Sequence, residues 1–217
     1  GVLAAGERLT TLGRSADATE RAFAARVIGE VGVRNFYQPL LPLLEDEDLD
    51  VRQATLIAAG KVNHPHSLPL IIGNLAHRSL RSAAMSALVA SGEALLPLTA
   101  DALSDERAYK KEDTIRLVRV CGQIKGARTV DLLKQHMDHT DHDVQFQVLS
   151  ALSSCGYRAE EEDIAEIQQI LNDQVRHGLR VLLAIQDIGQ DENLPLHSAL
   201  DYEFDQARKR AFLLLSF

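Results

Sequence analysis

The segment richest in side chains capable of chemistry is KQHMDHTDHDVQ, residues 134–145. It holds three histidines and three aspartates within eight positions: His136, Asp138, His139, Asp141, His142 and Asp143. Imidazole nitrogens and carboxylate oxygens are ligands that zinc uses in proteins. His136 and His139 are three residues apart near an expected helix end, so they could share a face. The same letters also suit a polar turn in which an aspartate caps the next helix.

The choice between metal site and turn depends on whether this segment is one copy of a repeat. Helical stretches with matching patterns start 31, 29, 33 and 31 residues apart: ERAFAARVIGEVG (20–32), VRQATLIAAGKVN (51–63), LRSAAMSALVASG (80–92), DTIRLVRVCGQIK (113–125) and VQFQVLSALSSCG (144–156). Apolar residues recur at helical spacing within each stretch. One column of the alignment contains Gly29, Gly60 and Gly122. The chain is therefore predicted to be a repeat array.

Each of these helices follows a shorter apolar stretch, and an acidic turn separates the two. Asp48 aligns with Asp141, and Asp50 aligns with Asp143. The histidine-rich segment is thus the turn of the fifth repeat. We expect Asp143, directly before the second helix, to cap it, and Asp143→Ala to cost about 1 kcal/mol. His139 and His142 should flank a solvent-facing turn, so their replacement by alanine should leave stability unchanged, and no metal site is predicted.

The repeat resembles the HEAT-repeat family, in the short form called phycobilisome-lyase HEAT-like repeats. The stretch DLDVRQATLIAAGKV carries the likeness, which extends over roughly residues 8–156, although Thr114 and Gln145 stand where the family has arginine. The resemblance implies an all-α fold, a right-handed α-solenoid (α-α superhelix) of about five to six helix pairs. It also implies a structural ladder in which arginines bridge to acidic turn residues, here Arg21, Arg52 and Arg81 with Asp48, Asp50, Asp141 and Asp143.

Two regions are expected, residues 1–156 with five helix pairs and residues 157–217 as a C-terminal helical extension. Residues 157–190 read either as a modified sixth pair or as one long helix. A final helix follows, with Asn193 as a cap and Pro195 in the first turn. This tail is similar to the segment after the HEAT repeats of bacterial membrane proteins that carry an ATP/ADP-transporter-like domain. The ends of the chain suggest a piece of a longer polypeptide.

Charge, cysteine content and the motifs present limit the classes of function that the chain could have. The net charge is −8 with a pI of about 5.5, whereas nucleic-acid binders are more often basic. Cys121 and Cys155 form no disulfide framework, so a reduced, cytoplasmic setting is expected. No apolar run is expected to approach the ~20 residues of a membrane span. Nucleotide-binding and hydrolase motifs are absent, so we predict no enzyme activity and no cofactor.

The concave face of such an array is the expected working surface. Positions three, seven and eleven of the second helices point away from the core, and the partner-binding residues predicted there are Arg26, Gln53, Ile57, Lys61, Arg119 and Phe146. This mixed surface suits a protein or peptide partner. The chain is therefore predicted to be a non-catalytic interaction or scaffold module. The alternatives are a regulatory domain of a bacterial transporter-like membrane protein and, suggested by the repeat subtype, a bilin lyase-like enzyme or chaperone. Oligomeric state is left open.

Overall fold

The computed structural model describes residues 2–105, 107, 109–188 and 195–217. Every regular element in these residues is a helix, which confirms the all-α fold class. The chain divides into two compact units, Gly1–Val120 and Cys121–Phe217. Each unit is a stack of helices with its own buried aliphatic core.

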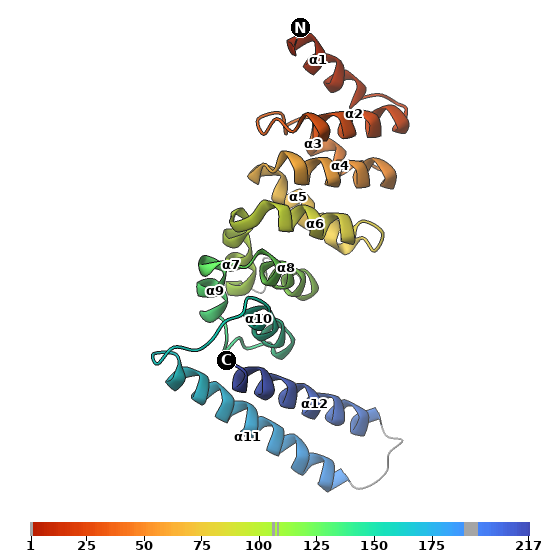
Figure 1. Ribbon diagram of the computed structural model, residues 1–217. Coiled ribbons are helices and arrows are strands. Elements are labelled where there is room, and N and C mark those ends of the chain that lie inside the picture. Colours follow the sequence, from red (N-terminus) through yellow and green to blue (C-terminus); the bar gives the residue numbers. More distant parts are fainter. Residues whose placement is uncertain (1, 106, 108, 189–194) are drawn as a thin grey trace. The chain divides into compact units, whose positions relative to one another are not determined.

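The first unit is built from helix pairs in which the second member is the longer. The second helices are α2 (Ala18–Val31), α4 (Leu49–Val62) and α6 (Arg81–Ser91), and α8 (Lys111–Ile124) runs to the end of this unit and into the next. Shorter helices precede them: α1 (Val2–Leu12), α3 (Leu40–Leu43), α5 (Leu68–Gly73) and α7 (Leu96–Ser104). Three 3-10 turns join them: η1 (Pro65–Ser67), η2 (Asn74–Ala76) and η3 (Gly92–Leu95). The long helices α2, α4 and α6 lie side by side (Figure 1).

The glycine column marks where neighbouring second helices approach most closely. A Cβ added at Gly29 would lie 2.8 Å from the Cα of Ala58, and one added at Gly60 would lie 3.1 Å from the Cα of Ala87. In the second unit, Gly122 faces Ala151 in the same way, also at 3.1 Å. A Cβ at Gly29 would require the two helices to separate, and one at Gly60 or Gly122 would require the facing alanine to shift by a few tenths of an ångström, so the repeat favours glycine opposite alanine at these contacts.

Aspartates cap the second helices two residues earlier than expected. Asp48 Oδ1 accepts hydrogen bonds from the backbone N–H groups of Asp50 and Val51, at 2.9 and 3.1 Å. Asp141 Oδ1 likewise accepts from the N–H groups of Asp143 and Val144. The prediction that Asp143 caps the second helix of the fifth repeat is therefore wrong. The helix already begins at His142, so Asp143 sits inside its first turn and the aspartate before that turn is the cap.

Replacing the cap should cost more than replacing the aspartate within the helix. Asp48→Ala is expected to lower the free energy of unfolding by about 1 kcal/mol, because two backbone N–H groups lose their acceptor. Asp50→Ala is the matched control, and it should cost only about 0.3 kcal/mol through the helix dipole. Urea denaturation followed by circular dichroism measures both. A larger loss for Asp50→Ala than for Asp48→Ala would show that the capping assignment is incorrect.

One segment of the described residues is long and apolar enough to cross a membrane, contrary to the expectation from sequence. It is Arg81–Ser104, with a mean hydropathy of 1.4. It is not one continuous helix, because α6 ends at Ser91 and Gly92 adopts a φ of 57° before α7 begins. Leu88 and Leu95 are fully buried in the first unit. The apolar character of the segment is thus accounted for by packing between two successive helices of the stack.

The second unit contains α9 (Ala127–Lys134), α10 (His142–Ser154), α11 (Ile164–Ile188) and α12 (Pro195–Leu215). Residues 164–188 form one long helix rather than a helix pair, which decides between the two alternatives left by the sequence. α12 packs along α11 and also contacts α10 (Figure 1). Pro195 begins α12, while Asn193 lies outside the described residues. Cys121 is buried in the core, as expected for a small apolar residue.

A buried polar network fixes the loop that leads into α11. Asp163 accepts a hydrogen bond from the Tyr157 hydroxyl at 2.6 Å and pairs with Lys134 Nζ at 2.5 Å. The hydrogen bonds from Lys134 and Tyr157 lower the pKa of Asp163 to about 2. Burial and the neighbouring carboxylate raise the pKa of Tyr157. In the same loop, the Ala159 N–H donates to the Phe217 carbonyl. This bond joins the segment before α11 to the residues after α12, so the two helices run antiparallel.

Candidate functional site

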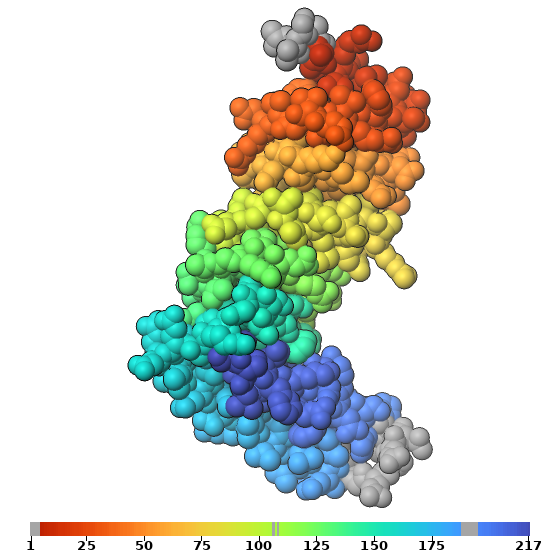
Figure 2. Space-filling model, viewed as in Figure 1, coloured from red at the N-terminus to blue at the C-terminus, as the bar shows by residue number. Residues whose placement is uncertain are grey.

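An open groove runs between the exposed faces of α2 and α4 in the first unit. Its volume is about 830 Å³. The side chains that line it come from both helices: Phe23, Arg26, Val27, Glu30, Val31, Asp50, Gln53, Ala54, Ile57, Ala58 and Lys61, with Gly29 at the base. These two helices lie in the red to orange part of the space-filling view (Figure 2). The groove exists because the Gly29–Ala58 contact brings the helices together while larger residues stand on either side.

Large apolar side chains are exposed around this groove. Phe23, Val31 and Ile57 keep 53%, 59% and 52% of their surface accessible. Single exposed apolar residues are ordinary in soluble proteins, but a group of three around one concavity marks a surface that can bind an apolar ligand group. The groove therefore offers an apolar floor of the kind found at the centre of protein interfaces.

Charged groups of both signs border the apolar part. Lys61 Nζ forms an ion pair with Glu30 Oε1 at 2.5 Å, linking α4 to α2. Both side chains are well exposed, so the pair adds little stability and remains available to a ligand. Arg26 and Asp50 also line the groove. The border can thus contribute salt-bridge partners of either sign to an incoming chain.

A second groove of about 440 Å³ follows between α4 and α6. It shares Gln53, Ile57 and Lys61 with the first groove, and its far side consists of small residues of α6: Ser82, Ala83, Ser86, Ala87 and Ala90. Four of the six residues predicted to bind a partner, Arg26, Gln53, Ile57 and Lys61, therefore lie on one continuous surface over three helices. We call this surface the α2–α4–α6 groove.

The other two predicted partner-binding residues lie elsewhere. Arg119 is exposed near the end of the first unit, and Phe146 is half-buried on α10 of the second unit. Neither lines either groove. Their role in binding a partner stays a prediction.

The arginine ladder uses other partners than the family pattern implies. Arg21 makes a two-pronged contact with Asp46, at 2.7 Å from Nε and 2.8 Å from Nη2, rather than with Asp48 or Asp50. Arg52 Nε donates to the Asn74 side-chain oxygen at 2.9 Å. Asn74 is buried and donates in turn to the carbonyls of Leu44 and Leu70. This contact connects the loops of adjacent repeats without a second charge.

The third ladder arginine reaches a backbone group. Arg81 Nε donates to the Leu75 carbonyl at 3.0 Å. Asp48 and Asp141, which the resemblance assigned to the same ladder, use their carboxylates to cap helices. The arginine column thus orders the turns through mixed acceptors, a carboxylate, an amide and a carbonyl.

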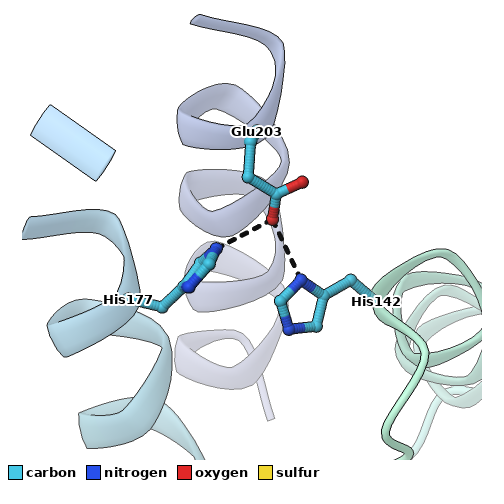
Figure 3. A group of neighbouring side chains, drawn as sticks. All are labelled: His142, His177 and Glu203. Carbon is cyan, nitrogen blue, oxygen red and sulfur yellow. Dashed lines mark hydrogen bonds and ion pairs between the residues drawn. The ribbon is translucent and has the colours of Figure 1, made fainter. Parts of the chain in front are cut away.

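A polar cluster in the second unit was not foreseen from the sequence. His142 Nδ1 lies 3.0 Å and His177 Nε2 lies 2.9 Å from the same oxygen, Glu203 Oε1 (Figure 3). The three side chains come from α10, α11 and α12. His142 is thus not a detached residue of a solvent-facing turn. His139 instead accepts a backbone hydrogen bond from Asp141, and among the described residues it does not join the cluster.

A buried arginine completes this cluster. Arg210 is 0% exposed, donates from Nη2 to Glu203 Oε1 at 3.1 Å, and donates from Nε to Gln174 Oε1 at 2.7 Å. Gln174 also donates to Gln145, the residue that replaces arginine in the fifth repeat. Burial opposes ionisation of Glu203, but hydrogen bonds from His177, His142 and Arg210 hold its pKa below the usual value. The carboxylate is therefore ionised at neutral pH.

The fold and its grooves define a class of protein, the helical-repeat proteins, whose stacked helix pairs present extended surfaces to partners. Within it, residues 7–91 match the family model described as HEAT repeats. This match covers the helix pairs that form the α2–α4–α6 groove, and it confirms the HEAT-like architecture there. The chain matches no curated protein.

Proposed function

We propose that the chain is a non-catalytic interaction module that binds a protein segment in the α2–α4–α6 groove. The observation that carries the proposal is the exposure of Phe23, Val31 and Ile57 around one groove between α2 and α4. Burying apolar surface of this kind is the main favourable term in most protein association. The match to HEAT repeats supports it, because such arrays commonly present binding surfaces of this kind.

The border of the groove defines the chemistry of the partner. A segment with one or two large apolar side chains would place them against Phe23 and Ile57. Charges on the same segment would then meet Arg26, Lys61 and Glu30 at the border. Such charge contacts select the partner and its orientation more than they add affinity. We therefore propose an amphipathic peptide segment with charges of both signs as the ligand class.

Selection from a displayed peptide library tests this function. Enriched peptides should bear apolar anchors, and their affinity for Ile57→Asp should fall at least tenfold, because a charge in the groove centre opposes apolar burial. Leu179→Asp is the matched control, since Leu179 on α11 is similarly exposed at 55% but outside the groove. Selected peptides that bind Ile57→Asp as tightly as the unmodified chain would reject the groove as the binding surface.

The wider setting is also a proposal. We propose a cytoplasmic module within a larger polypeptide, serving as a scaffold. The likeness of the tail to bacterial transporter-associated HEAT segments supports a runner-up, a regulatory domain tethered to a membrane protein. Copurification with a membrane protein from the same operon would favour that alternative, and an absorbance change on adding bilin would favour a lyase-like role.

A further inference from the structure

We propose that His142, His177 and Glu203 form a binding site for a divalent transition-metal ion of the zinc class. Each residue offers one ligand atom, and the three atoms lie within 4.8 Å of one another. Two imidazoles and one carboxylate are a recurrent zinc ligand set. The three ligands come from three different helices, so the site depends on the folded second unit and not on the local sequence (Figure 3).

The distances between the ligand atoms are already close to those of a coordination sphere. A tetrahedral zinc ion with bonds of about 2.0–2.1 Å places neighbouring ligand atoms roughly 3.3 Å apart. The nitrogen atoms of His142 and His177 lie 3.0 and 2.9 Å from Glu203 Oε1. Small side-chain adjustments would admit the ion. The side chains of His142 and His177 remain 40% and 25% exposed, which leaves a path for the ion and for a water ligand.

Binding requires only a change of tautomer at the histidines. Without an ion, His142 Nδ1 and His177 Nε2 each carry the proton that Glu203 Oε1 accepts. To coordinate, each ring shifts its proton to the other nitrogen and presents a lone pair, with no net proton released from a neutral imidazole. Glu203 supplies the negative charge. Acid opposes binding because the protonated imidazole has no lone pair left to donate.

The buried arginine sets a limit on affinity. Arg210 lies 3.1 Å from Glu203 Oε1, so its positive charge opposes that of an incoming ion. In the described residues, Glu203 Oε2 accepts none of the cluster's three hydrogen bonds. The guanidinium therefore holds Oε1 toward both imidazoles and competes with the ion for that oxygen. We expect a Kd on the order of 10 μM, weaker than that of a four-ligand structural site.

Titration of the full chain with Co²⁺ tests the site, because cobalt bound to nitrogen and oxygen ligands has a visible absorption band. One Co²⁺ per chain should bind, and Zn²⁺ should displace it. His177→Gln and Glu203→Gln should each weaken binding at least tenfold. His136→Gln removes a histidine of the same turn that lies outside the cluster, and it should leave binding unchanged.

Thermal unfolding gives a second readout that does not depend on the cobalt absorption band. Zn²⁺ at about 100 times its Kd should raise the Tm of the unmodified chain by about 5 °C, and should not do so for His177→Gln. The proposal is overturned if the unmodified chain binds no Co²⁺ at millimolar concentration. It is equally overturned if His136→Gln, and not His177→Gln, abolishes the band. Neither result bears on peptide binding in the α2–α4–α6 groove.

Discussion

Glu203→Ala should destabilise the second unit by about 3–5 kcal/mol, the largest effect expected for any single polar side chain of this unit. The substitution removes the charged partner of Arg210. Arg210 is fully buried, and Glu203 is the carboxylate with which it pairs. Removing the carboxylate leaves a guanidinium buried without its charged partner, and within the described part of the chain the neutral Gln174 oxygen is the acceptor that remains for it. His142 and His177 lose their shared acceptor at the same time.

Denaturant unfolding with circular dichroism measures this loss. Glu203→Gln keeps an oxygen acceptor near Arg210 and should cost clearly less than alanine. Glu161→Ala, at an exposed acidic residue of the same unit, should stay within about 0.5 kcal/mol of the unmodified chain. Equal unfolding midpoints for Glu203→Ala and Glu161→Ala would mean that Arg210 does not depend on Glu203.

Gly29→Ala should cost about 1–3 kcal/mol although it adds a single methyl group. The added Cβ would lie 2.8 Å from the Cα and 2.9 Å from the Cβ of Ala58, so two helix backbones would have to separate. Alanine is ordinarily the better helix former, by about 1 kcal/mol, so the intrinsic preference points the other way. The sign of the effect therefore tests the packing directly.

Gly73→Ala provides the matched control in the same unit. Gly73 ends α5, and a Cβ there meets nothing within 4 Å. This substitution should leave stability unchanged or raise it by up to about 1 kcal/mol. If thermal or urea unfolding showed the Gly29→Ala variant to be as stable as the Gly73→Ala variant or more stable, the close contact between α2 and α4 would be refuted.

The repeat and its long helices could be predicted because their causes are local. Periodic apolar residues define a helix, and Gly29, Gly60 and Gly122 recur because each faces an alanine of the next repeat. The same periodicity placed Arg26, Gln53, Ile57 and Lys61 on one face, and the structure brings those four together at a groove. The predicted cap was wrong because the sequence allows either Asp141 or Asp143 to precede the helix. Only the backbone geometry shows that Asp141 is the cap.

The cluster around Glu203 could not be predicted because its members are far apart in the chain. His177 is 35 residues after His142, and Glu203 follows 26 residues later, on helices with no repeat partner to align. The histidine-rich turn drew attention to His136 and His139, which among the described residues lie outside this cluster. One usable signal was present in the sequence, because Gln145 replaces the column arginine. In the structure Gln145 accepts a hydrogen bond from Gln174, which accepts one from Arg210.

Amide chemical-shift mapping of a library-selected peptide on the labelled chain tests the central proposal most directly. Binding in the α2–α4–α6 groove should change the backbone resonances of Phe23, Arg26, Ile57 and Lys61, which line it. Resonances of α11 and α12, in the other unit, should stay in place. Changes concentrated on the exposed apolar residues of α11, such as Val175 and Leu179, with the groove unaffected, would contradict the proposed binding surface.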